Sequence, residues 1–122
     1  MFPKKILVVD DEPNFTKLIV EYFKSMGYEV LSAPDPQEAL TLFKKNKPRV
    51  VLLDFNMPLV TGDQFLPVLQ AIDPTAKVIV LTGCIEEEVE EKFRGMGYFA
   101  FFEKGSLSLD KLRQKVDEAL RY

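Results

Sequence analysis

The sequence of 122 residues contains no histidine and only one cysteine. Without histidine, a Ser-His or Cys-His nucleophile pair is excluded, and so is any zinc site that needs a histidine ligand. A single cysteine cannot form a disulfide within the chain, so we expect a reducing compartment and a cytoplasmic protein. Chemistry must therefore come from carboxylates, lysine, threonine or a hard metal ion.

Long apolar runs and an excess of positive charge are also missing. The apolar run 6–9 is far too short for a signal peptide or a membrane span, so we expect no membrane association. The formal net charge is −3, which argues against direct nucleic-acid binding because that function needs a basic surface. With 47% hydrophobic residues, the chain can bury a core, and we expect one domain, 1–122, with no output domain.

Two hydrophobic periods alternate along the chain. Short β-branched runs such as 5–9 and 50–53 are typical of parallel strands that are buried on both faces. Between such runs, apolar residues recur at helical spacing and predict inward-facing stripes. Two of these stripes are Phe15, Leu18, Ile19, Tyr22, Phe23 and Met26, and Phe65, Leu66, Leu69 and Ile72. Five such βα units predict an α/β domain with a doubly wound five-stranded parallel sheet and helices on both faces.

Helix boundaries have local signals of their own. Asp35 is placed to cap a helix, with Pro36 at the first helical position and Glu38 three residues after the cap. Gly27 occupies the position expected of a left-handed residue that ends the first helix.

Polar residues stand where the predicted strands end. They are Asp10 and Asp11 after the first strand, Asp54 at the third, Thr82 at the fourth and Lys104 after the fifth. Ligands of such sheets bind at the carboxyl ends of the strands, so we expect these side chains to meet there. Crowded carboxylates repel one another, and a divalent cation relieves the repulsion. An all-oxygen set suits Mg²⁺, which usually also binds phosphate, so a carboxylate nucleophile and phosphoryl transfer are indicated.

The segments around these residues are VVDDEP (8–13), LDFNMP (53–58), LTG (81–83) and EK (103–104). In order and spacing they resemble the receiver domains of two-component response regulators, over essentially the whole chain. The resemblance implies a (βα)5 flavodoxin-like fold with strand order 2-1-3-4-5. It also implies that the protein functions in signal transduction.

The resemblance implies a role for each site residue. Asp54 is the phosphoacceptor, supplied by a histidine kinase or a histidine phosphotransfer protein. Asp10, Asp11, Asp54 and the backbone carbonyl of Asn56 hold Mg²⁺, with Asp11 preferred over Asp10 as a direct ligand. Asn56 and Cys84 tune how fast the phosphate is lost.

The resemblance also implies which residues bind phosphate and which transmit the signal. Thr82 and Lys104 contact the phosphoryl group. Thr82 and Phe101 are the switch residues, because the aromatic ring of Phe101 turns inward as Thr82 moves toward the phosphate. The signal passes to the surface of the fourth helix, fifth strand and fifth helix, which binds an unidentified output protein or a second copy in a dimer. The sequence departs from the family at Gly105, where proline with a cis bond is common, and at Phe101, which replaces the usual tyrosine. A cis bond without proline would cost roughly 3 kcal/mol, so the geometry after Lys104 stays open.

Other interpretations stay open at this point. The chain could be a pseudo-receiver, an interaction module that never takes phosphate. An aspartate-nucleophile phosphatase of the haloacid-dehalogenase type ranks third, because Glu12 and Asn56 stand where that family has a second aspartate. Individually, the aspartates could be turn residues, Lys104 a solvated lysine, and Phe101 and Cys84 packing residues.

Overall fold

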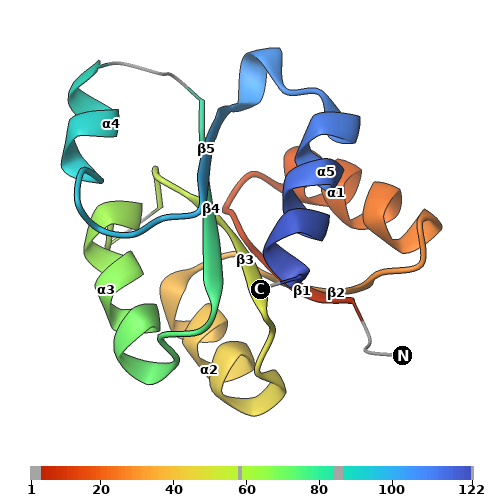
Figure 1. Cartoon of the computed structure of the whole chain (residues 1–122), viewed down its shortest axis with the longest axis horizontal. Helices are drawn as coiled ribbons and strands as arrows, with labels where there is room; N and C mark the ends of the chain where they lie inside the picture. Colours follow the sequence, from red (N-terminus) through yellow and green to blue (C-terminus); the bar gives the residue numbers. More distant parts are fainter. Residues whose placement is uncertain (1–3, 58, 84–86, 122) are drawn as a thin grey trace.

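The computed structural model describes residues 4–57, 59–83 and 87–121, and in them strands and helices alternate (Figure 1). The strands are β1 (Lys5–Val9), β2 (Glu29–Ala33), β3 (Val50–Asp54), β4 (Lys77–Thr82) and β5 (Ala100–Glu103). The helices are α1 (Pro13–Ser25), α2 (Pro36–Asn46), α3 (Gly62–Ile72), α4 (Glu87–Lys92) and α5 (Leu109–Leu120), with a short 3-10 helix at Lys104–Ser106. None of the helices within these ranges is long and apolar enough to cross a membrane.

The strands form one parallel sheet in the order β2-β1-β3-β4-β5. Helices α1 and α5 cover one face, and α2, α3 and α4 lie on the other (Figure 1). Successive side chains of a strand point to opposite faces, so Leu7 enters one core and Val8 the other. Both faces are covered, which explains why the central strands are continuous apolar runs. The predicted fold class and strand order are confirmed.

The local helix signals are also confirmed. The Asp35 carboxylate accepts a hydrogen bond from the Glu38 backbone N–H at 2.8 Å, and Pro36 begins α2. Gly27 follows the last turn of α1 with φ +88°, a conformation that glycine adopts without steric cost. These caps fix where the chain turns back toward the sheet.

Three residues predicted to face inward are exposed instead. Leu18, Met26 and Ile72 are 50%, 44% and 41% exposed, so that part of the prediction is wrong. Neighbouring helical residues are 100° apart, and the sheet covers only the stripe centred on Ile19 and Phe23 in α1. Ile72 is the last residue of α3, where the helix ends.

Candidate functional site

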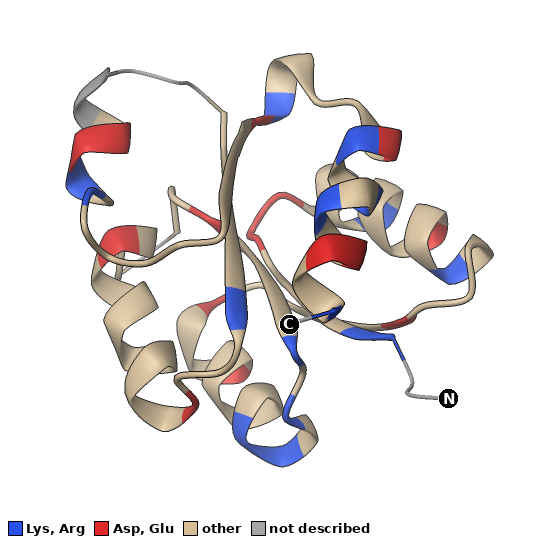
Figure 2. Ribbon diagram, in the orientation of Figure 1, with Lys and Arg blue, Asp and Glu red and all other residues tan. Residues whose placement is uncertain are grey.

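Three carboxylates and one lysine meet at the carboxyl edge of the sheet. Asp10 follows β1, Glu12 immediately precedes α1, Asp54 ends β3 and Lys104 follows β5. One oxygen of each carboxylate lies within 4.8 Å of the others. The Lys104 Nζ lies 2.7 Å from Asp10 Oδ2, 3.1 Å from Glu12 Oε1 and 3.4 Å from Asp54 Oδ1. Figure 2 shows these acidic segments of the β1–α1 loop and the end of β3 facing each other.

Strand register brings these residues together. Val9 of β1 pairs with Leu53 of β3, so Asp10 and Asp54 each extend one residue beyond that pair. Thr82 pairs with Glu103, which places Lys104 just past the end of β4. Because all strands run in the same direction, their ends deliver these groups to the same edge.

Asp10 and Asp54 are buried, which disfavours the ionised form of each carboxylate. The side chains of Asp10 and Asp54 are 1% and 2% exposed. Burial, and next the charge of Asp10, raise the pKa of Asp54 to about 7, although Lys104 and the Asn56 backbone N–H (3.3 Å) act against the shift. Burial also raises the pKa of Asp10, opposed by Lys104 and by the Glu12 backbone N–H at 2.9 Å. The site therefore holds negative charge that the fold alone does not fully compensate.

Lys104 is held firmly as a cation. Its side chain is 8% exposed. Burial by itself lowers its pKa, but the hydrogen bond to Asp10 and the charges of Asp54 and Asp10 outweigh burial, so the pKa is raised. The Nζ also lies 4.6 Å from the centre of the Phe15 ring, a distance suited to a cation–π contact. Lys104 thus supplies positive charge next to Asp54 at any physiological pH.

The residues fit a hard divalent cation. Asp54 Oδ2 is buried and accepts no hydrogen bond from the described residues. Three carboxylates face a single lysine, and no histidine or cysteine belongs to the cluster. An oxygen-only set with uncompensated negative charge is the environment that Mg²⁺ prefers.

A cluster of aromatic rings joins the site to β5. Phe101 is half-buried and contacts Phe93 edge-on at 5.7 Å and Tyr98 at 5.9 Å between ring centres. Phe93 is fully buried and also contacts Phe55, the residue after Asp54, at 5.9 Å. These contacts connect Phe55, next to Asp54, with Phe101 through packed rings.

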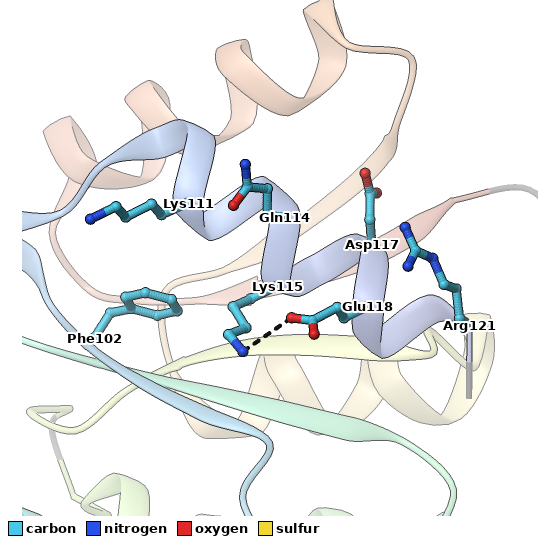
Figure 3. Close-up of a pocket in the computed structure, with 7 residues that line it drawn as sticks. All are labelled: Phe102, Lys111, Gln114, Lys115, Asp117, Glu118 and Arg121. Atoms are coloured by element: carbon cyan, nitrogen blue, oxygen red, sulfur yellow. Dashed lines mark ion pairs between the residues drawn. The ribbon is translucent and has the colours of Figure 1, made fainter.

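A separate hollow lies over α5, away from the carboxylates (Figure 3). It has a volume of about 510 Å³ and is lined by Phe102, Lys111, Gln114, Lys115, Asp117, Glu118 and Arg121. Lys115 and Glu118 form an ion pair of 3.1 Å within its wall. Lys104 and the carboxylates of the site do not line it.

Residues 6–117 match the family model described as the response regulator receiver domain. The chain belongs to this family. It is 31% identical over 120 residues to the sporulation initiation phosphotransferase F of Bacillus subtilis (strain 168). The aligned region covers 98% of this chain and 96% of that protein. It is 33% identical over 120 residues to the transcriptional regulatory protein GlrR of Escherichia coli (strain K12), covering 97% of this chain but 26% of that protein.

Solved structures of receiver domains also resemble this chain. A response regulator receiver domain protein from Clostridium thermocellum superimposes with a TM-score of 0.88 at 30% identity, covering 96% of this chain and 94% of that one. A CheY-like receiver domain protein from Methanospirillum hungatei JF-1 gives 0.87 at 25% identity, covering 98% of both chains. The protein is thus a receiver domain of two-component signalling, a phosphoacceptor family whose members interact with histidine kinases and output domains. This membership decides against the phosphatase interpretation.

The receiver domain brings together most residues that the sequence singled out. Asp10, Asp54 and Lys104 are in contact, and Thr82 is fully buried at the end of β4. Asn56 is exposed beside Asp54. Asp11 is exposed, lies outside the cluster of carboxylates and lines a neighbouring hollow of about 380 Å³.

Two sequence predictions concern Cys84 and the peptide bond after Lys104, and the structure adds Glu12 to the site. Cys84 lies outside the described residues. The described backbone contains no cis peptide, so Lys104 and Gly105 are joined by a trans bond. Glu12 was not selected as a site residue, yet it is the third carboxylate around Lys104. The available signal was the unbroken acidic run 10–12 directly after a buried strand.

Proposed function

We propose that this receiver domain accepts a phosphoryl group on Asp54 from a histidine kinase or a histidine phosphotransfer protein, in a Mg²⁺-dependent reaction. One observation carries the proposal. Asp54 is a buried carboxylate whose Oδ2 accepts no hydrogen bond from the described residues, while its Oδ1 lies 3.4 Å from Lys104. A side chain that costs stability and has a reactive atom without a partner is typical of a functional group.

The reaction is a displacement at phosphorus. An oxygen of the ionised Asp54 carboxylate forms a bond to phosphorus as the P–N bond to the donor imidazole breaks. The electron pair leaves with the imidazole, which takes up a proton, and the product is an acyl phosphate. Lys104 neutralises the transferred phosphoryl oxygens, and the buried edge holds the nucleophile in position.

Residues already at this edge would form the metal site. Asp10, Asp11, Asp54 and the backbone carbonyl of Asn56 would hold Mg²⁺. Bound there, the ion supplies positive charge for the phosphoryl oxygens and favours the ionised form of Asp54. The cluster of Asp10, Glu12 and Asp54 oxygens within 4.8 Å supports this assignment for Asp10 and Asp54.

The output of the reaction is a change of surface. Thr82 would turn its hydroxyl to the phosphoryl group, and Phe101 would move inward against Phe93. The surface of α4, β5 and α5 would then bind a partner, or a second copy in a dimer. Asn56 and Cys84, close in sequence to Asp54 and Thr82, would set the lifetime of the phosphorylated state. The ring contacts of Phe101 support the coupling.

Intact-mass spectrometry with Mg²⁺ and phosphoramidate tests the proposal, because phosphoramidate carries the same type of P–N bond. We expect one phosphoryl adduct, labile to hydroxylamine, on wild type and none on Asp54→Asn. Asp73→Asn removes a carboxylate at the end of α3 and serves as the matched control, which should still be labelled. If wild type binds Mg²⁺ and acquires no adduct, the phosphate-independent interaction module is the better description.

A further inference from the structure

Glu12 lies at the mouth of the site. Its side chain is 60% exposed, whereas those of Asp10 and Asp54 are almost completely buried. Glu12 occupies the cap position before α1, with φ −89° and ψ 107°, but its carboxylate makes no capping hydrogen bond. The carboxylate instead accepts a hydrogen bond of 3.1 Å from Lys104, a residue 92 positions away. The Glu12 side chain therefore pairs with Lys104 and does not cap its own helix.

Three carboxylates are already paired with Lys104 in this arrangement. A lysine ammonium has three N–H donors, and three carboxylates surround the Nζ. A phosphoryl oxygen that binds Lys104 therefore competes with the carboxylates already paired with it.

The three carboxylates differ in how easily they can leave. Asp10 is 1% exposed and has the shortest contact, 2.7 Å, so losing Lys104 would leave a buried charge without a partner. Asp54 is the residue that carries the phosphoryl group and stays at the site. Glu12 is mostly in water, where an ion pair is weak and a free carboxylate is well solvated. Glu12 is the partner that exchanges at the lowest cost.

We propose that Glu12 is a positioning residue that holds Lys104 toward the mouth of the site until a phosphoryl oxygen replaces the Glu12 carboxylate. The proposal rests on the proposed phosphorylation of Asp54. A carboxylate that competes with phosphate for Lys104 slows phosphoryl capture. An exposed pair of this kind changes an equilibrium roughly two- to fivefold, which sets the expected gain in rate when it is removed.

Two variants separate direct pairing from a general charge effect. Glu12→Gln keeps the length of the side chain and removes its charge. Glu12→Asp keeps the charge but shortens the side chain by one methylene, so we expect its pairing with Lys104 to weaken. Glu21→Gln removes the same charge from an exposed position on α1 and is the matched control.

The first measurement is the NMR signal of the Lys104 ammonium and its neighbouring methylene in Mg²⁺-free protein. We expect the Lys104 signal to shift in Glu12→Gln and Glu12→Asp and to stay in place in Glu21→Gln. The second is the rate of phosphorylation by phosphoramidate at saturating Mg²⁺. Here we expect both Glu12 variants to be about two- to fivefold faster than wild type, with Glu21→Gln unchanged.

The outcomes separate the two proposals. No phosphorylation of wild type would refute the proposed function, while the NMR arm would still report on the Glu12–Lys104 contact. A Lys104 signal that ignores the loss of Glu12 would overturn the positioning role. So would phosphorylation of Glu12→Gln at or below the wild-type rate, which is the result expected if Glu12 served only to bind Mg²⁺. If Glu12→Gln alone is accelerated, the charge of Glu12 and not its contact with Lys104 controls the rate, which would also overturn the positioning role.

Discussion

Replacing Asp54 with asparagine should stabilise the Mg²⁺-free, unphosphorylated protein. Asparagine has nearly the same shape and carries no charge, so it avoids the burial of a carboxylate next to Asp10. Burial, followed by the charge of Asp10, raises the pKa of Asp54 to about 7 in the folded protein, against 3.8 for the exposed group. Between these values the unfolded chain has lost the proton and the folded protein keeps it, so stability falls as pH rises from 3.8 to about 7.

The size of the gain follows from the same difference. About 3 pH units at 1.36 kcal/mol each give an upper limit of about 4 kcal/mol above pH 7. Asparagine also removes one ionic partner of Lys104, which keeps Asp10 and Glu12. We therefore expect Asp54→Asn to raise the free energy of unfolding by about 1–3 kcal/mol in this range.

Urea denaturation in EDTA over a series of pH values measures this effect. The gain should grow as pH rises from about 4 to about 7 and level off above that. Asp73→Asn is the control of opposite sign, because hydrogen bonds from the Thr75 hydroxyl (2.6 Å) and backbone N–H (2.9 Å) lower the pKa of Asp73. That variant should lose about 1 kcal/mol. An Asp54→Asn protein no more stable than wild type at pH 8 would refute the argument from burial.

Three further results are expected from the same geometry. Lys104→Met should cost about 3 kcal/mol at pH 8 by urea denaturation, because it leaves two buried carboxylates without their cation, and adding Asp54→Asn should restore part of the loss. Gly62→Ala should cost about 1–3 kcal/mol, since its Cβ would lie 2.9 Å from the Asp54 carbonyl oxygen, while Gly83→Ala, with nothing within 4 Å, should be neutral. Mg²⁺ at ten times its dissociation constant should raise the wild-type melting temperature by about 5 °C and that of Asp54→Asn far less; an equal rise in both would remove Asp54 from the metal site.

Much of the fold was predictable because its signals are local. Parallel strands buried on both faces are uninterrupted apolar runs, and β1 and β3 were placed to within a residue of their ends. The cap at Asp35 and the turn at Gly27 depend on single residues with strong conformational preferences. The meeting of Asp10, Asp54 and Lys104 followed from parallel strand ends sharing an edge, which requires no knowledge of side-chain positions.

What the sequence did not predict depends on tertiary contacts. Nothing local tells whether Glu12, at the start of a helix, turns back to cap that helix or reaches a lysine 92 residues away. The exposure of Leu18 and Met26 depends on how much of α1 the sheet and α5 can cover, and the periodicity of one helix does not contain that information. The burial of Phe93 also depends on tertiary packing, because its contact with Phe55 joins segments that are distant in sequence.

The unfavourable burial of charge at the site can supply free energy for its proposed output. A ligand shifts a conformational equilibrium only by the difference in its affinity for the two states. In the unphosphorylated protein, Asp10 and Asp54 share one lysine in a dry edge, so the resting state already contains unrelieved repulsion. Mg²⁺ bound at these carboxylates would relieve that repulsion, and we expect part of the free energy released to favour the proposed movement of Thr82 and Phe101. A receiver with a well-solvated Asp54 would be more stable at rest and would have less free energy with which to bias its switch.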